Sequence, residues 1–346
     1  MKRIYCTLLA IGFAVGLMAQ QHKANYFNHL DLGVTVSSTG IGLDVSMPVG
    51  DYVRVRTGFT YMPKFRLKSS FPVEFNNQDV NETRMRRVTD MMYNLTGFSI
   101  DDRVDMTMQP TWGNFRFLVD VMPIPNNKHW NVTLGFYAGP SQIGKAYNVT
   151  EDAPTLMAVG LFNSLYTKAY MGEPLFQYED SHGNMHYFDL GGAGELAERL
   201  AESGMVGMPL GKFPDGDHAM MVPDENSMAR ATMKVNKFRP YLGLGYTTSF
   251  SKDNKWKLAV DAGVLMWGGA PHVYVDNVYK TNYVQNGYDM VRFDTDAREF
   301  VKVQPQRIDL TRDVSGVQGK VGSMVRVAKR FKCYPVVGVT ISRSLF

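Results

Sequence analysis

The chain has 346 residues, is 45% hydrophobic and 20% charged, and contains 32 glycines. This composition excludes a disordered or collagen-like chain, and the two cysteines exclude a disulfide scaffold or a cysteine-rich zinc module. The net charge of +4 comes without a block of basic residues, so a nucleic-acid partner is not expected. Beyond the first residues no run of 18 apolar residues occurs, and the sequence predicts no helical membrane span.

The N-terminus has the parts of a secretory signal peptide. The basic residues Lys2 and Arg3 precede an apolar run that ends at Ala19, and the chain then turns polar. A membrane anchor would need roughly 20 apolar residues, and this run is shorter. We therefore predict an exported protein with a signal peptide over residues 1-19, cleavage after Ala19, and a mature chain over 20-346.

Eight segments of the mature chain alternate apolar and polar residues with a period of two, the pattern of β-strands. One face of each segment is apolar, and the other carries glycine, hydroxyl and charged residues. Each is about 9–12 residues long, as a tilted strand that crosses a bilayer requires. The predicted strands lie near 27-36, 40-48, 51-61, 113-122, 129-138, 238-247, 255-267 and 334-346.

The connections between these segments alternate in length. Short turns follow the second, fourth and sixth segments, whereas the long connections 62-112, 139-237 and 268-333 follow the third, fifth and seventh. Only the first link, at 37–39, breaks this rule by being short. If the chain starts in the periplasm, all long connections lie outside, as in bacterial outer-membrane barrels. We predict an all-β fold, an eight-stranded antiparallel up-and-down transmembrane β-barrel with long extracellular loops.

A soluble barrel of eight strands would point its apolar face inward, so the orientation of the faces decides between the two solutions. The polar face is rich in glycine, which suits the narrow lumen of an eight-stranded barrel. It also carries charges of both signs, which can pair inside the lumen. The candidates for these ion pairs are Asp31, Asp44, Arg54, Arg56, Arg116, Asp120, Lys257 and Asp261. His29, on the same face, is expected to be an interior hydrogen-bonded residue.

All four tryptophans lie at ends of predicted strands. They are Trp112, Trp130, Trp256 and Trp267. Tryptophan concentrates where a membrane meets water, so we predict an aromatic girdle with two of these side chains at each edge of the bilayer.

The chain ends in a strand that terminates at Phe346, similar to the C-terminal strand that the outer-membrane assembly machinery reads. Ser342 and Ser344 share the phase of Phe346 but are polar, and a bulge near Arg343 would reconcile the two. Together with the segment Phe238-Arg-Pro-Tyr-Leu-Gly-Leu-Gly-Tyr246, the pattern resembles the outer-membrane β-barrel domain common in Bacteroidetes, a relative of the small OmpA-like barrels.

This resemblance implies the barrel fold and the outer membrane of a Gram-negative bacterium. It also implies outer-membrane lipid and the barrel-assembly machinery as partners. It covers the strands, under a third of the chain, and carries over no catalytic residue.

The three long connections contain structural signals of their own, and we expect them to form a compact extracellular cap. Strand alternation continues over 104–108, and Gly183-Asn184 indicates a hairpin between 176–180 and 185–189. The predicted helices lie over 81–97, from Pro154 to Tyr166, over 195–201 and over 314–331.

These connections contain few candidates for catalytic or metal-binding residues. His182 and His186 have the spacing of a zinc pair, but the hairpin removes the helix that this spacing requires. Asp215, Asp217 and His218 could bind calcium, yet the full ligand set of a calcium loop is missing. We predict no metal, no cofactor and no catalytic residue.

Three functions remain open. The leading hypothesis is a non-enzymatic outer-membrane protein whose barrel anchors a cap that binds an unknown extracellular ligand or stiffens the cell surface. The second is a barrel enzyme, a lipid or peptide hydrolase, which would need a serine, a histidine or paired carboxylates at the outer rim. The third is a small pore, which requires additional barrel strands from segments such as 70–76 and 228–236, because eight strands leave no open lumen.

Overall fold

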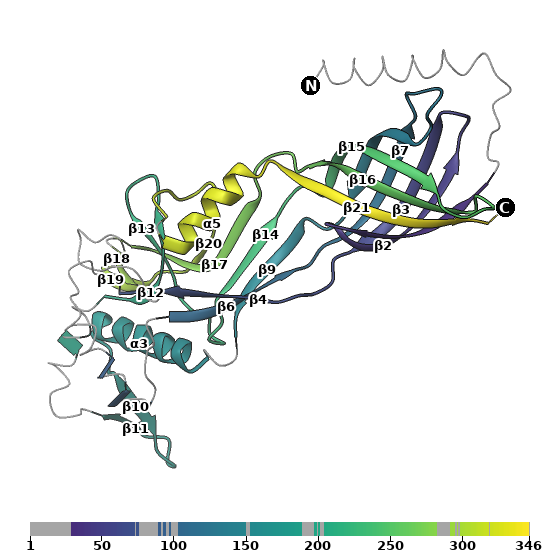
Figure 1. Ribbon diagram of the computed structural model, residues 1–346. Helices are drawn as coiled ribbons and strands as arrows, with labels where there is room; N and C mark the ends of the chain where they lie inside the picture. Colours follow the sequence, from purple (N-terminus) through teal and green to yellow (C-terminus); the bar gives the residue numbers. More distant parts are fainter. Residues whose placement is uncertain are drawn as a thin grey trace.

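The computed structural model describes residues 29–72, 74–75, 103–149, 153–188, 204–281, 291–294, 298–317 and 319–345, with a few isolated positions between these ranges. Figure 1 shows a barrel at one end of the molecule and a second part, rich in strands, at the other. The predicted signal peptide and Phe346 lie outside the described residues. Among the described residues, no helix has both the length and the apolar character needed to cross a membrane.

Eight antiparallel strands form a closed barrel, in which neighbours follow chain order and the last strand pairs with the first. Each overlaps one of the eight predicted segments, so the predicted fold class is confirmed. The barrel strands are β1 (Asp31–Ser37), β2 (Gly40–Pro48), β3 (Val53–Tyr61), β7 (Gly113–Val121), β8 (Trp130–Ala138), β15 (Phe238–Ser249), β16 (Trp256–Met266) and β21 (Cys333–Ser344).

The apolar face of the barrel strands points outward and the polar face points inward. In β1, Leu32, Val34 and Val36 are 47 to 60% exposed, whereas Asp31 and Thr35, which alternate with them, are buried. The same alternation runs along β2, β15 and β21. A continuous apolar surface of this kind is stable in lipid rather than in water. The barrel therefore has the organisation of a transmembrane barrel.

Glycines stand on the inner wall where the strands approach most closely. A Cβ atom at Gly135 would lie 2.1 Å from the carbonyl oxygen of Phe117, and one at Gly58 would lie 2.4 Å from that of Leu43. Contacts under 3.0 Å to backbone require the strands to move. The narrow lumen therefore depends on the absence of side chains at these positions.

The final barrel strand is regular. Its ladder with β16 runs from Cys333 to Arg343 without a register shift. The expected bulge near Arg343 is therefore wrong. Ser344 continues the inward phase and donates a hydrogen bond to the Asp31 carboxylate at 2.5 Å, so its polarity suits the lumen.

The three long connections fold together into a second, nine-stranded sheet that the sequence analysis did not predict. The first and last strands along this sheet, β4 and β5, are separated by one residue in the chain, so the sheet curls round until its ends meet. The strands are β4 (Leu67–Pro72), β5 (Glu74–Phe75), β6 (Arg103–Pro110), β9 (Gln142–Asn148), β12 (Val206–Lys212), β13 (His218–Met221), β14 (Arg230–Lys234), β17 (His272–Thr281) and β20 (Gln306–Asp309).

Two helices, α3 (Ala153–Met171) and α5 (Gly319–Arg330), pack on this sheet around one hydrophobic core. Phe162 from α3, Val278 from β17 and Val325 from α5 are all buried in it. The connections therefore form a single domain rather than separate loops. We call this part, with its sheet and helices, the sheet domain.

The predicted helices meet different outcomes. α3 coincides with the helix expected from Pro154 onward. The helix expected over 314–331 begins only at Gly319, because Gly316 and Gly319 have positive φ angles of 65° and 59° that interrupt the preceding turn. The expected helices over 81–97 and 195–201 lie mostly outside the described residues.

Two hairpins complete the sheet domain. β10 (Phe176–Glu179) pairs with β11 (Met185–Phe188), where the sequence predicts a hairpin. β18 (Val291–Asp294) pairs with β19 (Glu299–Lys302), which the sequence analysis did not predict.

Candidate functional site

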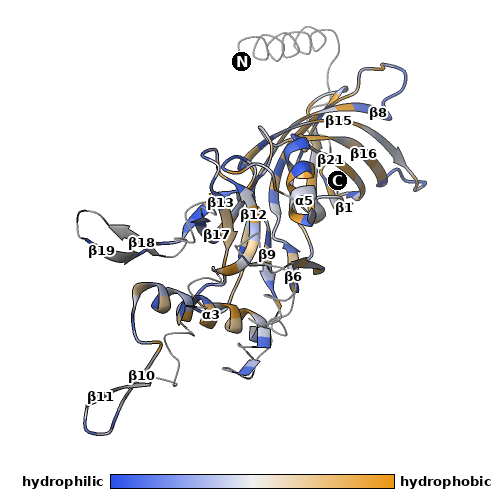
Figure 2. Cartoon of the chain, turned by 90° about the vertical axis from the view of Figure 1, so that its left-hand side faces the viewer, coloured by the Kyte–Doolittle hydropathy of each residue, from blue (hydrophilic) through white to orange (hydrophobic). Residues whose placement is uncertain are grey.

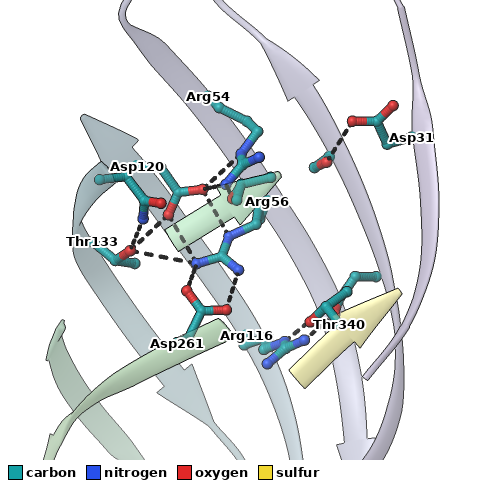
Figure 3. A network of polar contacts seen from close by, with 12 residues as sticks. Asp31, Arg54, Arg56, Arg116, Asp120, Thr133, Asp261 and Thr340 are labelled. Atoms are coloured by element: carbon teal, nitrogen blue, oxygen red, sulfur yellow. Dashed lines mark hydrogen bonds and ion pairs between the residues drawn. The ribbon is translucent and has the colours of Figure 1, made fainter. Parts of the chain in front are cut away.

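The barrel lumen contains an ion-pair network centred on Arg56 (Figure 3). The Arg56 guanidinium contacts an Asp120 oxygen at 2.8 Å and donates to both carboxylate oxygens of Asp261 at 2.8 and 2.9 Å. Arg54 donates to the same Asp120 carboxylate at 2.8 Å, and Thr133 does so at 2.8 Å. Since β3 supplies both arginines and the carboxylates come from β7 and β16, the network ties together strands around the barrel.

Two further ion pairs lie on either side of this centre. On the extracellular side, Arg116 bonds to Asp44 and also donates to the Thr35 hydroxyl at 2.7 Å. On the periplasmic side, the Lys257 ammonium donates to the Asp31 carboxylate at 2.9 Å and contacts His29 at 2.8 Å. The structure thus brings all eight charged candidates into contact with a partner of opposite sign.

This network fills the lumen rather than lining a channel. Buried charges are costly unless they are paired, and here each faces an opposite charge. The extra strands that a pore would need do form from the segments 70–76 and 228–236. They belong to the sheet domain as β4, β5 and β14, however, and leave the barrel at eight strands.

Trp112 and Trp267 do not belong to the expected girdle, because both lie inside the barrel. Both are only 5% exposed, and their rings lie 6.1 Å apart inside the extracellular mouth of the barrel. Tyr334 packs edge-on against Trp112 at 4.8 Å and stacks on Trp267 at 5.5 Å. The physical reason is strand phase: Trp112 shares the inward phase of Asn114, and Trp267 that of Leu265. We call Trp112, Trp267 and Tyr334 the aromatic plug.

Trp130 and Trp256 lie on the outer face, at 48 and 39% exposure, where β8 and β16 leave the periplasmic turns. The extracellular end of the outer face carries Tyr61 and Phe238 instead, both exposed. Tyr61 and Phe238 could have been identified from the sequence, because both lie in the outward phase of their strands. Tryptophan thus occurs at the periplasmic edge, and tyrosine and phenylalanine at the other.

Arg239 is a central residue of the mouth that sequence reasoning missed. It is fully buried, and its guanidinium donates to the carbonyl oxygen of Asn236 at 2.6 Å, to that of Pro140, and to the Asn114 side chain. It also lies 5.9 Å from the Trp112 ring. Arg239 therefore ties the barrel to chain segments that enter the sheet domain.

The residues that the sequence analysis weighed as metal ligands and set aside make other contacts. The Lys280 ammonium bonds to Asp215 and lies 3.4 Å from Asp217, and the hydrogen bond from Lys280 lowers the pKa of the Asp215 carboxyl. His182 lies in the turn of the β10–β11 hairpin, where its backbone N–H donates to Asp180 at 2.9 Å. In the part of the chain that the structure describes, no three histidine, cysteine or acidic side chains gather as a metal site.

A cluster of aromatic and basic side chains lies on the outer surface of the sheet domain. Arg307 and Lys234 lie over the Tyr274 ring at 4.8 and 5.2 Å, and His272 stacks on it at 5.8 Å. His272 also contacts the Asp309 carboxylate at 2.6 Å. We call these five residues the Tyr274 cluster. The cluster joins β14, β17 and β20. Its charged groups and aromatic rings are of the kind that contact a binding partner.

No family model matches the chain, and no curated protein matches it. Two solved structures with some likeness are those of CarO and CarO2 from Acinetobacter baumannii. CarO is 11% identical, covering 91% of this chain and 97% of its own, with a TM-score of 0.35. CarO2 is 12% identical, covering 92% of this chain and all of its own, with a TM-score of 0.37. Both identities and both TM-scores are low, and the closed barrel follows from the strand pairing of this chain itself.

Proposed function

We propose that the protein is a non-enzymatic outer-membrane protein whose barrel is a closed anchor for the sheet domain. The sheet domain then binds an extracellular ligand, and the Tyr274 cluster is its candidate contact surface. A signal peptide cleaved near Ala19 and insertion by the barrel-assembly machinery belong to the same proposal.

The observation that carries this proposal is the filling of the barrel along its length. Ion pairs occupy the lumen from Asp31 to Arg116, and the aromatic plug covers the extracellular mouth. Meanwhile, three connections that could each have been a separate loop share one sheet and one core. A barrel closed to solutes beside an elaborate external domain supports anchoring and display rather than transport.

Electrical recording from the full-length protein tests the anchor. Purified protein in a planar bilayer should give no stable single-channel conductance, because ion pairs and the aromatic plug occupy the lumen. The same preparation must migrate differently on a denaturing gel before and after boiling, which shows that a closed barrel was present. Reproducible conductance steps from such a preparation would contradict the anchor and favour a pore.

A second experiment separates the anchor from the domain. Replacing all three connections with short turns, while keeping Trp112, Trp267 and Tyr334, should leave a barrel that still inserts and still shifts on heating. Removing only 139–237 is a poorer test, because it takes β9, β12, β13 and β14 out of a shared sheet. Failure of the shortened barrel to insert would show that the barrel is no independent anchor.

A further inference from the structure

Helix α5 is bound directly to the extracellular rim of the barrel. It ends at Arg330, and β21 begins at Cys333 after only two residues. The backbone N–H of Trp267, at the end of β16, donates to the carbonyl oxygen of Lys332 at 3.2 Å. Figure 1 shows α5 beside the beginning of β21, and Figure 2 shows that α5 carries both hydrophobic and hydrophilic residues. The C-terminal turn of α5 therefore lies where the lipid-facing surface of the barrel ends.

Only part of the apolar surface of α5 is used by the fold. Gly322, Val325 and Ala328 are buried against the sheet domain. Met324, Val327 and Phe331, spaced by three and four residues, form a second apolar stripe that is exposed. Positions with this spacing lie on one face of a helix. The stripe ends at Phe331, two residues before β21 begins at Cys333.

The charge of this segment is of one sign. Residues 319–332 contain no acidic residue, and all five basic side chains are exposed. They are Lys320, Arg326, Lys329, Arg330 and Lys332. A short helix with an exposed apolar stripe and basic flanks is the pattern of a helix that lies against an anionic membrane surface.

We propose that α5 contacts the outer leaflet, with Met324, Val327 and Phe331 toward the lipid and the basic residues on lipid phosphate groups. The inference rests on the barrel being inserted in the outer membrane. It commits to anionic, phosphate-bearing lipid for two reasons: the stripe ends two residues before β21, at the rim of the lipid-facing barrel wall, and the basic residues beside it are complementary to a negatively charged lipid surface. The helix would also fix the sheet domain relative to the membrane, because Val325 and Ala328 hold it in that domain.

Lipid quenching of a fluorophore tests this contact in the full chain. Cys333 is the single cysteine of residues 20–346, so a Cys333→Ser background accepts a label at Val327→Cys. The protein is reconstituted in phosphatidylcholine vesicles with and without phosphatidylglycerol, both with spin-labelled lipid. We expect the label at 327 to be quenched, and more strongly with phosphatidylglycerol. A matched label at Glu225→Cys, in the exposed turn before β14, should not be quenched.

Removing charge tests the role of the basic residues. Each basic side chain near an anionic surface changes the bound-to-free ratio about fivefold. The triple variant Lys329→Gln, Arg330→Gln and Lys332→Gln should therefore lose most of the gain from phosphatidylglycerol while keeping its heat-dependent shift on a gel.

The outcomes are distinguishable. Protein that shows the gel shift but no quenching at 327 would overturn the helix contact and leave the barrel anchor intact. Equal quenching with and without phosphatidylglycerol would overturn the role of anionic lipid, because phosphatidylcholine carries phosphate without a net charge. Protein that fails to insert at all would overturn the proposed function and this inference together.

Discussion

Arg56 and Asp120 meet at two points inside the barrel, at 2.8 and 2.9 Å, although they lie 64 residues apart in the chain. Both are buried, and each has a further partner: Arg56 also pairs with Asp261 on β16, and Asp120 also pairs with Arg54 on β3. The pair joins β3 to β7 and, through Asp261, reaches across the lumen to β16.

Removing Arg56 should destabilise the barrel strongly. Arg56→Met would leave Asp261 without an arginine and Asp120 with Arg54 alone, and breaking a buried ion pair in this way costs about 3–5 kcal/mol. The free energy of unfolding in urea, measured in detergent micelles, checks this. Arg230→Met is the matched control, because Arg230 is half exposed and pairs with Asp224 at 3.3 Å on the surface. It should cost under about 1 kcal/mol. Equal losses for the two variants would contradict an important role for the lumen network.

A methyl group on the inner wall should prevent the barrel from closing. Gly135→Ala places a Cβ atom 2.1 Å from the Phe117 carbonyl oxygen, so the strand pair has to shift. The fraction of protein that shows the heat-dependent gel shift should fall. Gly160→Ala, in α3, is the control, because a Cβ atom there meets nothing within 4 Å. That variant should gain about 0.5–1 kcal/mol from helix propensity and keep the shift. If the Gly135→Ala barrel closed normally, the strands around position 135 would be able to move apart, and the prediction would be contradicted.

The four tryptophans should divide into two pairs by contact with lipid. In proteins that each keep one tryptophan, with phenylalanine at the other three positions, brominated lipid should quench Trp130 and Trp256 but not Trp112 and Trp267. The outer pair is exposed on the barrel wall, and the inner pair is buried in the aromatic plug. Quenching of all four to a similar degree would restore the girdle that the sequence alone suggested.

Asp309 should make the sheet domain sensitive to acid. Burial raises the pKa of Asp309, but hydrogen bonds from Thr311 and His272 outweigh it and hold the pKa below its usual value. The carboxylate therefore contributes stability at pH values above its unfolded pKa of about 3.9 and loses it as the pH falls through the lower folded value. Asp309→Asn should cost about 1–3 kcal/mol at pH 7, since buried partners lose a charged acceptor.

The Asp309→Asn variant is also the reference for the pH dependence, because its side chain cannot be ionised. The difference in unfolding free energy between the unchanged protein and Asp309→Asn should begin to shrink as the pH falls below about 4, where the carboxyl of the unfolded chain takes up its proton, and should be lost once the pH falls through the lower pKa of the folded protein. Urea unfolding at pH 7 and pH 3 measures both values. A difference that stays constant would show that the charge of Asp309 is unimportant to the domain.

The barrel was predictable because each of its strands is long and has one lipid-facing side. A period of two then sorts residues such as Leu32 and Asp31 to opposite faces without knowledge of the partners. The same phase rule, applied to Trp112 and Trp267, would have placed both inside. The expected place of these two in a girdle was wrong because it used their position at strand ends and ignored their phase.

The sheet domain was not predictable in this way. Its strands are short, with only four residues in β13 and β20, and β17 pairs with strands from two different connections. Such pairings depend on long-range contacts rather than on local pattern. Arg239 was missed for a related reason: its carbonyl partners, such as that of Pro140, are supplied by backbone that carries no sequence signal.

The shared sheet of the three connections has a consequence for proteolysis at the cell surface. Each connection enters and leaves the sheet domain through the barrel rim, so a single cut would not release the domain. The fragments on either side of a cut would remain joined by the strand ladder, for example between β9 and β14 or between β14 and β17. A nicked protein would therefore keep its fold until denaturant separated the fragments.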